Sequence, residues 1–169
     1  VMWLVKKMPL ITGGGIPQTR GVINGRISYK HPFIELVSKF VGGVLALSAG
    51  LSLGREGPSV QIGSYVGCLV SKWGRVLAGE RKQLLAAGAG AGLAAAFAAP
   101  LASSLLVIES IERFDAPKTA ITTLLAGVVA GGVASMIFPI NPYFQIDAIS
   151  PGLTFFSQVK LFLLLAAVI

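Results

Sequence analysis

Two long stretches without a charged side chain constrain what this chain can fold into. Residues 83–108 and 119–146 contain no Lys, Arg, Asp or Glu. A helix that crosses the hydrocarbon core of a bilayer needs about 20 apolar residues, and both stretches exceed that length. Over the whole chain only 12% of the residues are charged, against about 25% in soluble domains. The pattern predicts an integral membrane protein with several spanning or membrane-buried helices.

The net charge of +7 does not indicate nucleic-acid binding. The basic residues fall in two separate groups rather than in one patch interleaved with aromatic side chains. Such groups are typical of loops on the cytoplasmic side of membrane proteins, and we expect the first group to be cytoplasmic. The first group is Lys6, Lys7, Arg20, Arg26 and Lys30, and the second is Lys72, Arg75, Arg81 and Lys82.

The single cysteine, Cys68, and the single histidine, His31, predict neither an internal disulfide nor a metal site. We expect no cofactor. Because the last apolar run continues to residue 169, we expect the chain to be one piece of a longer membrane protein.

Helix-start and helix-stop signals divide the chain into a succession of helices. A polar, glycine-rich segment covers 1–32, and a polar turn is expected at 78–82. Pairs of glycines four residues apart predict close helix packing; these are Gly88 with Gly92 and Gly127 with Gly131. The expected helices cover 33–53, 57–77, 84–99, 101–112, 117–138 and, after an aqueous loop at 139–150, a last segment from Pro151.

The segment GAGAGLAAA, 88–96, also resembles the phosphate-binding turn of dinucleotide-binding domains. Glu109 follows where a ribose-binding acid would lie. A soluble dinucleotide-binding enzyme is therefore the alternative from another functional class. Against it, the third glycine lies one residue early, Pro100 would interrupt the crossover helix, and that helix would show almost no polar face to water.

The motif GREGPSV, 54–60, places Glu56 ahead of a helix N-terminus in an otherwise charge-free region. A helix N-terminus carries unpaired N–H groups and about half a positive charge, so it is an anion site. Glu56 can occupy that site, be displaced by an external anion, and then carry a proton, because burial favours the neutral carboxyl. The alternative is a helix cap in which Glu56 pairs with Arg55.

A second glycine motif, GGGIP at 13–17, leads into another short helix. Its glycines allow backbone N–H groups to turn toward a ligand. Two broken helices whose N-termini aim at one point are what a membrane anion site requires. A flexible loop is the alternative for this motif.

Together, GGGIPQTRG, GREGPSVQIGS and GAGAGLAAAFAAPLASSLLVIES resemble, in order and spacing, the CLC family of chloride channels and proton–chloride antiporters. The resemblance implies an all-α membrane protein of two inverted repeats with broken, re-entrant helices. Residues 1–169 would form a partial transmembrane domain, the first repeat. The resemblance further implies a homodimer in the cell membrane, with 101–138 at the subunit contact. Each subunit would carry chloride or another halide, as a voltage- or pH-gated channel or an antiporter rather than an enzyme.

The resemblance also implies roles for single residues. Glu56 would be the gating and proton-carrying residue. Gly14 replaces a serine whose hydroxyl contacts the anion, which makes a fluoride-selective transporter an alternative. Ser110 replaces the internal proton-accepting glutamate of the antiporters, so the expected internal proton path consists of Glu109, Ser110 and Lys39. The expected anion site consists of Gly13, Gly14, Gly15, Ile16, Pro17, Arg55, Glu56, Gly57 and Pro58.

Overall fold

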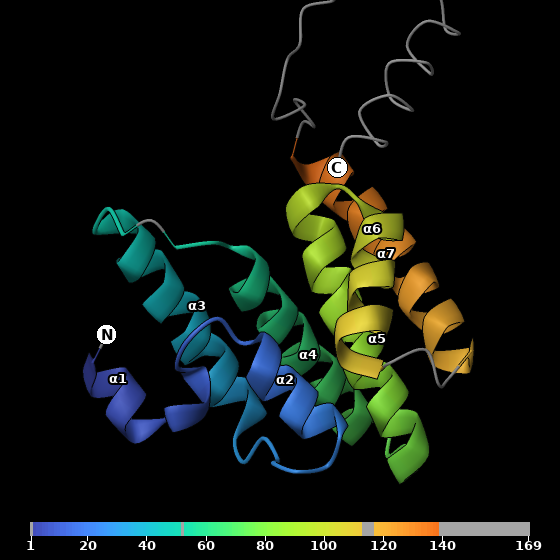
Figure 1. The fold of residues 1–169 in the computed structure, drawn as a ribbon, viewed down its shortest axis with the longest axis horizontal. Coiled ribbons are helices and arrows are strands. Elements are labelled where there is room, and N and C mark those ends of the chain that lie inside the picture. Colours follow the sequence, from blue (N-terminus) through green and yellow to red (C-terminus); the bar gives the residue numbers. More distant parts are fainter. Residues whose placement is uncertain (1, 52, 113–116, 139–169) are drawn as a thin grey trace, which may run out of the picture. The chain divides into compact units, whose positions relative to one another are not determined.

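The computed structural model describes residues 2–51, 53–112 and 117–138, which belong to one compact unit (Figure 1). These described residues form helices and no strand, which confirms the all-α prediction. The expected loop at 139–150 and the helix expected from Pro151 lie outside the described residues. The elements are α1 (Met2–Lys7), the 3-10 helix η1 (Pro9–Ile11), α2 (Ile16–Ile23), α3 (Pro32–Ser48), α4 (Glu56–Trp73), α5 (Ala78–Phe97), α6 (Pro100–Val107), the π-helical segment η2 (Ile108–Glu112) and α7 (Pro117–Ile137).

Three expected boundaries are wrong. The helix expected over 57–77 ends at Trp73. Residues 78–82, expected as a polar turn, form the start of α5. The Glu80 carboxylate accepts the backbone N–H of Leu77 at 3.3 Å, an arrangement that caps a helix N-terminus. The helix expected over 33–53 ends at Ser48, because Gly50 adopts a φ of 78° that is incompatible with a continuing helix.

The break between α5 and α6 falls where the sequence predicts it. Ala98 has a left-handed φ of 52°, and α6 begins at Pro100. Proline lacks the N–H that would continue the helix and its ring clashes with the preceding turn, so the chain must change direction here. The broken helix expected at this point is therefore confirmed.

The helix α5 lies between α4 and α7 (Figure 1). A Cβ added to Gly88 would overlap the Gly63 carbonyl of α4, and one added to Gly92 would overlap the Ser59 carbonyl. The close packing predicted for this glycine pair is confirmed. Because the GAGAGLAAA segment lies inside a helix, it cannot form the strand-to-helix turn of a dinucleotide site, and that interpretation is wrong.

The glycines of α7 pack inside the unit. Gly127 and Gly131 are buried, and a Cβ added to Gly127 would lie 3.5 Å from the Ala94 side chain and 3.5 Å from the Pro100 carbonyl oxygen. They therefore serve contacts within the chain and are not available for a subunit contact. The outward face of α7 carries large apolar side chains instead, including Leu125 and Val129, which are 61% and 65% exposed.

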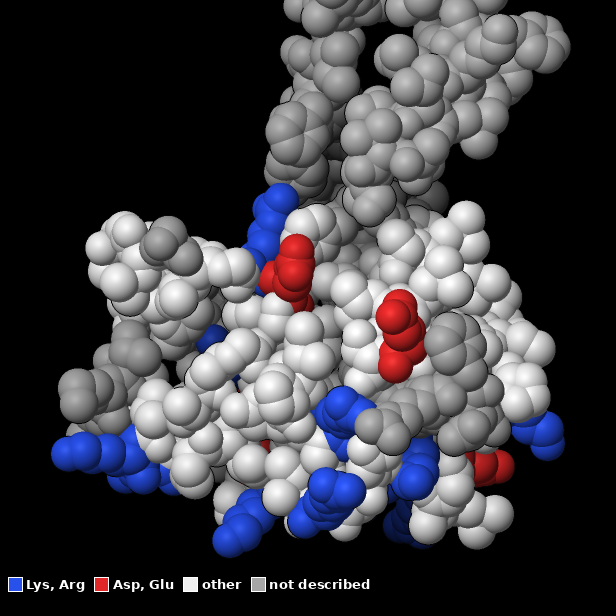
Figure 2. Space-filling view, viewed as in Figure 1, with Lys and Arg blue, Asp and Glu red and all other residues white. Residues whose placement is uncertain are grey.

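Charge is distributed unevenly over the unit. Figure 2 shows Lys and Arg side chains gathered along one edge, at the bottom of the view, where the α2–α3 loop and the α4–α5 turn lie in Figure 1. The α2–α3 loop contains Arg26 and Lys30 of the first basic group, and the α4–α5 turn contains Arg75 of the second. Residues of both groups therefore lie at the same end of the helices, a bias that is typical of membrane proteins. Among the described residues, α7 is the single helix that is long and apolar enough to cross a membrane, judged by length and composition.

Candidate functional site

The two glycine motifs meet in space. The segment 13–15 precedes α2 and packs against the first turn of α4. A Cβ added to Gly57 would overlap the Gly14 carbonyl, and one added to Gly15 would lie 2.6 Å from the Gln61 Oε1 atom. Gly13 and Gly15 have φ values of 68° and 97°, a conformation that side chains other than glycine rarely adopt. The fold thus brings the N-termini of α2 and α4 together, and the flexible-loop alternative does not fit this contact.

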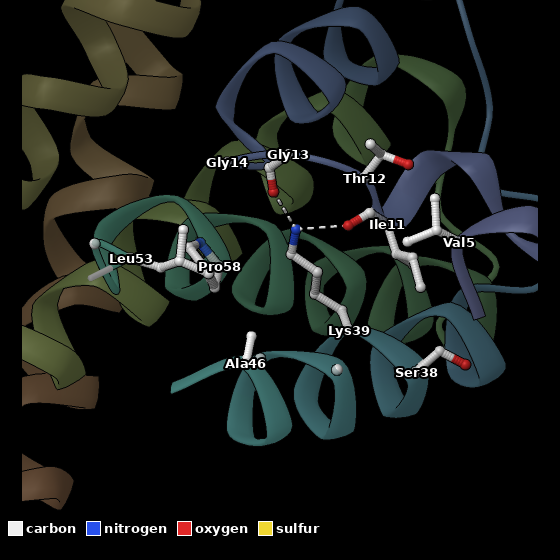
Figure 3. Close-up of a pocket in the computed structure, with 13 residues that line it drawn as sticks. Val5, Ile11, Thr12, Gly13, Gly14, Ser38, Lys39, Ala46, Leu53 and Pro58 are labelled. Carbon is white, nitrogen blue, oxygen red and sulfur yellow. Dashed lines mark hydrogen bonds between the residues drawn. The ribbon is translucent and has the colours of Figure 1, made fainter. Parts of the chain in front are cut away.

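A cavity of about 400 Å³ lies beside this contact, between the glycine segment, α3 and the start of α4 (Figure 3). Lys39 reaches into it from α3. Its ammonium donates hydrogen bonds to the Ile11 carbonyl at 2.9 Å and to the Gly13 carbonyl at 2.7 Å. The side chain is only 5% exposed. Because a buried charge is stable only when it is compensated, these two carbonyls fix the ammonium and the ammonium fixes the glycine segment.

Glu56 is the first residue of α4, so it lies at a helix N-terminus as expected. Its side chain is exposed within the described unit and not buried. The N-cap residue is Arg55, and no side-chain hydrogen bond caps this helix, so Glu56 is not the capping residue. The Arg55 guanidinium lies 5.0 Å from the centre of the Phe97 ring, a cation–π distance.

The remaining residues of the expected anion site lie in the first turns of the same two helices. Ile16 and Pro17 open α2, with Gly15 as the N-cap residue. Pro58 is the third residue of α4, a first-turn position where the missing N–H is tolerated, and it lines the cavity. An added Cβ at Gly14 meets no atom within 4 Å, so space does not require a glycine there.

The residues of the expected internal proton path come from separate elements. Glu109 and Ser110 lie in η2, where Glu109 is exposed and Ser110 half-buried. The segment η2 packs against α2. Lys39 instead lies on α3 and belongs to the cavity wall.

A buried polar network lies beneath the glycine contact, and the motifs did not point to it. The Gln61 amide donates to the Leu10 carbonyl at 2.7 Å and to the Tyr65 hydroxyl at 3.0 Å. The Tyr65 ring packs on Tyr29, with ring centres 4.3 Å apart. The Tyr29 hydroxyl donates to Ser64 at 3.4 Å. The sequence does contain one indication of this network: Gln61 and Tyr65 are polar residues one helical turn apart in the charge-free stretch 57–71.

Tyr29, in the loop between α2 and α3, has a perturbed pKa. Burial raises the pKa of Tyr29; the nearby Cys68 and the Glu35 carboxylate raise it further, and hydrogen bonds with Ser64 and Thr19 oppose the rise. Since an ordinary tyrosine already titrates near 10, the Tyr29 hydroxyl stays neutral at physiological pH. It therefore remains a hydrogen-bond donor inside the unit.

Comparison with known proteins places these features in a family. A sequence model of the voltage gated chloride channel family matches residues 1–169. The H(+)/Cl(-) exchange transporter ClcA of Citrobacter koseri is 41% identical over 139 residues, which make up 80% of this chain and 29% of that protein. The ClcA proteins of Salmonella arizonae and Salmonella paratyphi B are 40% identical over the same shares of both chains. This chain thus spans 29% of the length of these curated relatives.

Proposed function

The chain belongs to the voltage-gated chloride channel family and is an integral membrane protein, and from this premise we propose that it forms part of an anion-transport pathway. Chloride or a related halide is the transported ion. The relatives that it matches are named as proton–chloride exchange transporters, which favours coupled exchange with protons over a channel.

The observation that carries this proposal is the contact between the two glycine motifs. The backbone overlap that an added Cβ would cause at Gly57 requires the starts of α2 and α4 to touch. Both helix starts carry N–H groups without helical partners. The Lys39 ammonium in the adjoining cavity adds a positive charge. Unpaired N–H groups beside a buried cation form a favourable environment for a dehydrated anion.

Glu56 is the gate in this proposal. Its carboxylate lies at the N-terminus of α4 and competes with an external anion for the same N–H groups. Protonation removes the charge and releases the carboxyl from the helix end. The same side chain therefore both opens the pathway and carries a proton.

A fluoride-selective transporter is the second candidate, and Gly14 favours it. Neither φ nor space requires glycine at this position, because its φ lies outside the left-handed region and an added Cβ meets nothing within 4 Å. The missing side-chain hydroxyl at Gly14 therefore changes the hydrogen bonds that the site offers to an anion and is not a requirement of the fold. Fluoride would be bound through backbone N–H groups.

The test uses the full-length protein reconstituted in liposomes that contain chloride or fluoride. Anion efflux is followed with ion-selective electrodes, and proton movement is followed from the pH of the weakly buffered medium. We expect Glu56→Gln and Glu56→Ala to keep anion efflux, to lose its dependence on external pH, and to move no protons. The control is Glu80→Gln, which removes an exposed acid at the start of α5 and should behave as wild type. Unchanged pH dependence and proton movement in Glu56→Gln would contradict the gate.

A further inference from the structure

A second carboxyl group, that of Glu35, is buried without full pairing. Glu35 lies in the first turn of α3 and is 5% exposed. Its Oε1 atom accepts the backbone N–H of His31 at 3.3 Å, and its Oε2 atom has no hydrogen-bond partner among the described residues. A buried carboxylate oxygen without a hydrogen-bond partner destabilises the folded protein while the carboxylate is charged. An added proton on Oε2 would remove the charge.

Glu35 and Lys39 lie four residues apart on α3, a spacing that allows an ion pair. The two side chains nevertheless form no ion pair within the described residues. The Lys39 ammonium is held by backbone carbonyls near the glycine segment. The other titratable groups in the preceding loop are Arg26, Tyr29 and Lys30, and those on α4, which packs against α3, are Glu56, Tyr65, Cys68 and Lys72. His31 precedes the helix and contributes its backbone N–H.

Glu35 and Glu56 lie at opposite ends of one helix pair. The helix α3 runs from Pro32 to Ser48 and packs against α4, which returns from Glu56 (Figure 1). At 1.5 Å per residue, Glu35 lies about 20 Å along α3 from the end that leads to Glu56. The Tyr29 and Ser64 hydroxyls are hydrogen-bonded to each other. A second hydrogen-bonded pair, Gln61 and Tyr65, lies next to the glycine contact, and the Tyr65 ring packs on Tyr29.

We propose that Glu35 is a proton-exchanging carboxyl, which serves the end of the pathway remote from Glu56 in place of the acid that is absent at Ser110. The inference rests on the proposed anion–proton function. A proton from water bonds to the Glu35 Oε2 atom, and the side chain changes from an anion to a neutral acid. On release that bond breaks, the proton passes to the Tyr29 hydroxyl oxygen, and the Tyr29 hydrogen passes to the Ser64 oxygen along their hydrogen bond. The Ser64 hydrogen leaves to water, so both hydroxyls end neutral and the Glu35 side chain is again an anion.

Glu109 is the competing assignment, because it neighbours Ser110 in the sequence. Its side chain is exposed within the described unit, whereas Glu35 is 5% exposed and its Oε2 atom has no hydrogen-bond partner among the described residues. The geometry therefore favours Glu35 over Glu109.

The experiment measures anion efflux and proton movement together for the full-length protein in liposomes. The variants are Glu35→Gln, Glu35→Asp, Glu109→Gln and Tyr29→Phe, with Glu80→Gln as the control for loss of an exposed acid. In Glu35→Gln we expect anion efflux to continue and protons moved per anion to fall about tenfold or more, since a positioned acid–base group contributes about 10²–10⁴-fold to proton transfer. Glu35→Asp keeps a titratable carboxyl and should restore some of the proton movement.

Tyr29→Phe keeps the ring packing on Tyr65 and removes one relay hydroxyl, so it should also lower proton movement, and it tests the proposal if Glu35→Gln does not fold. A wild-type proton-to-anion ratio in folded Glu35→Gln, or loss of coupling in Glu109→Gln alone, would overturn the assignment. If the wild-type protein moves anions but no protons, the role of Glu35 is overturned and the proposal of anion transport stands. Absence of anion efflux in the wild type would instead refute the proposed function itself.

Discussion

Replacement of Gly57 by alanine tests the contact on which the candidate site depends. The added Cβ would lie 2.6 Å from the Gly14 carbonyl carbon and would overlap the carbonyl oxygen. Both atoms belong to the backbone, so no side chain can rotate away. The two segments must separate by about 1 Å for the carbon atoms to reach an ordinary contact distance.

The expected size of the effect follows from two opposing terms. Overpacking of a close contact costs about 1–3 kcal/mol, and alanine in place of glycine within a helix offsets about 0.5–1 kcal/mol of that cost. We therefore expect Gly57→Ala to lower the free energy of unfolding by up to about 2.5 kcal/mol. Gly14→Ala is the matched control, because its Cβ would enter open space. It should leave stability unchanged or raise it by about 0.4–1 kcal/mol.

The assay is denaturant-induced unfolding of the full-length variants in detergent, followed by tryptophan fluorescence, with anion efflux measured on the same preparations. Separation of the helix starts should also reduce efflux in Gly57→Ala. If Gly57→Ala were as stable and as active as Gly14→Ala, the two helix starts would not touch in the protein, and the proposed anion site would be wrong.

Three further predictions concern single side chains. Gly14→Ser adds one neutral hydrogen bond to a bound anion and should change the chloride-to-fluoride preference about threefold to tenfold in efflux competition, since such a bond contributes about 0.5–1.5 kcal/mol. Lys39→Met leaves two backbone carbonyls without their charged donor and should lower the free energy of unfolding by about 1.5–3 kcal/mol, whereas Lys39→Arg should lower it less. A cysteine at exposed Leu125 should crosslink two subunits of the expected homodimer in the membrane, and one at buried Gly127 should not; equal crosslinking at both positions would contradict the orientation of α7.

The helix boundaries set by glycine and proline could be predicted from the sequence, because these residues restrict the backbone locally. The starts of α2 after Gly15 and of α6 at Pro100 follow from this restriction. The start of α5 could not be predicted from polarity alone, because residues 78–82 look like a turn until Glu80 is recognised as a capping residue. Helix boundaries could thus be predicted where a single glycine or proline restricts the backbone.

Tertiary contacts account for what the sequence did not predict. Tyr29 and Tyr65 are far apart in the chain, and no local pattern indicates that their rings pack together. Glu35 and Lys39 lie four residues apart on α3, a spacing that favours an ion pair on a helix, but contacts from other elements bury both side chains and backbone carbonyls bind the Lys39 ammonium. The meeting of 13–15 with Gly57 was expected from the two glycine motifs, whereas the buried hydroxyl network beneath it depends on how α2, α3 and α4 pack.

Residues of the candidate site should respond differently to substitution, because some of them set the backbone geometry and others carry charge. At Gly15 and Gly57 the backbone itself forms the contact, and Gly13 and Gly15 have left-handed φ values, so any side chain at these three positions alters the geometry of the helix ends. At Gly14 a side chain has room, so a substitution there can change only the chemistry offered to the anion. Charge resides in Lys39, which backbone carbonyls fix, and in Arg55 and Glu56, which are exposed at a helix end. Because Glu56 is the exposed acid that can compete with an anion, gating should depend on Glu56, and the integrity of the site should depend on Lys39.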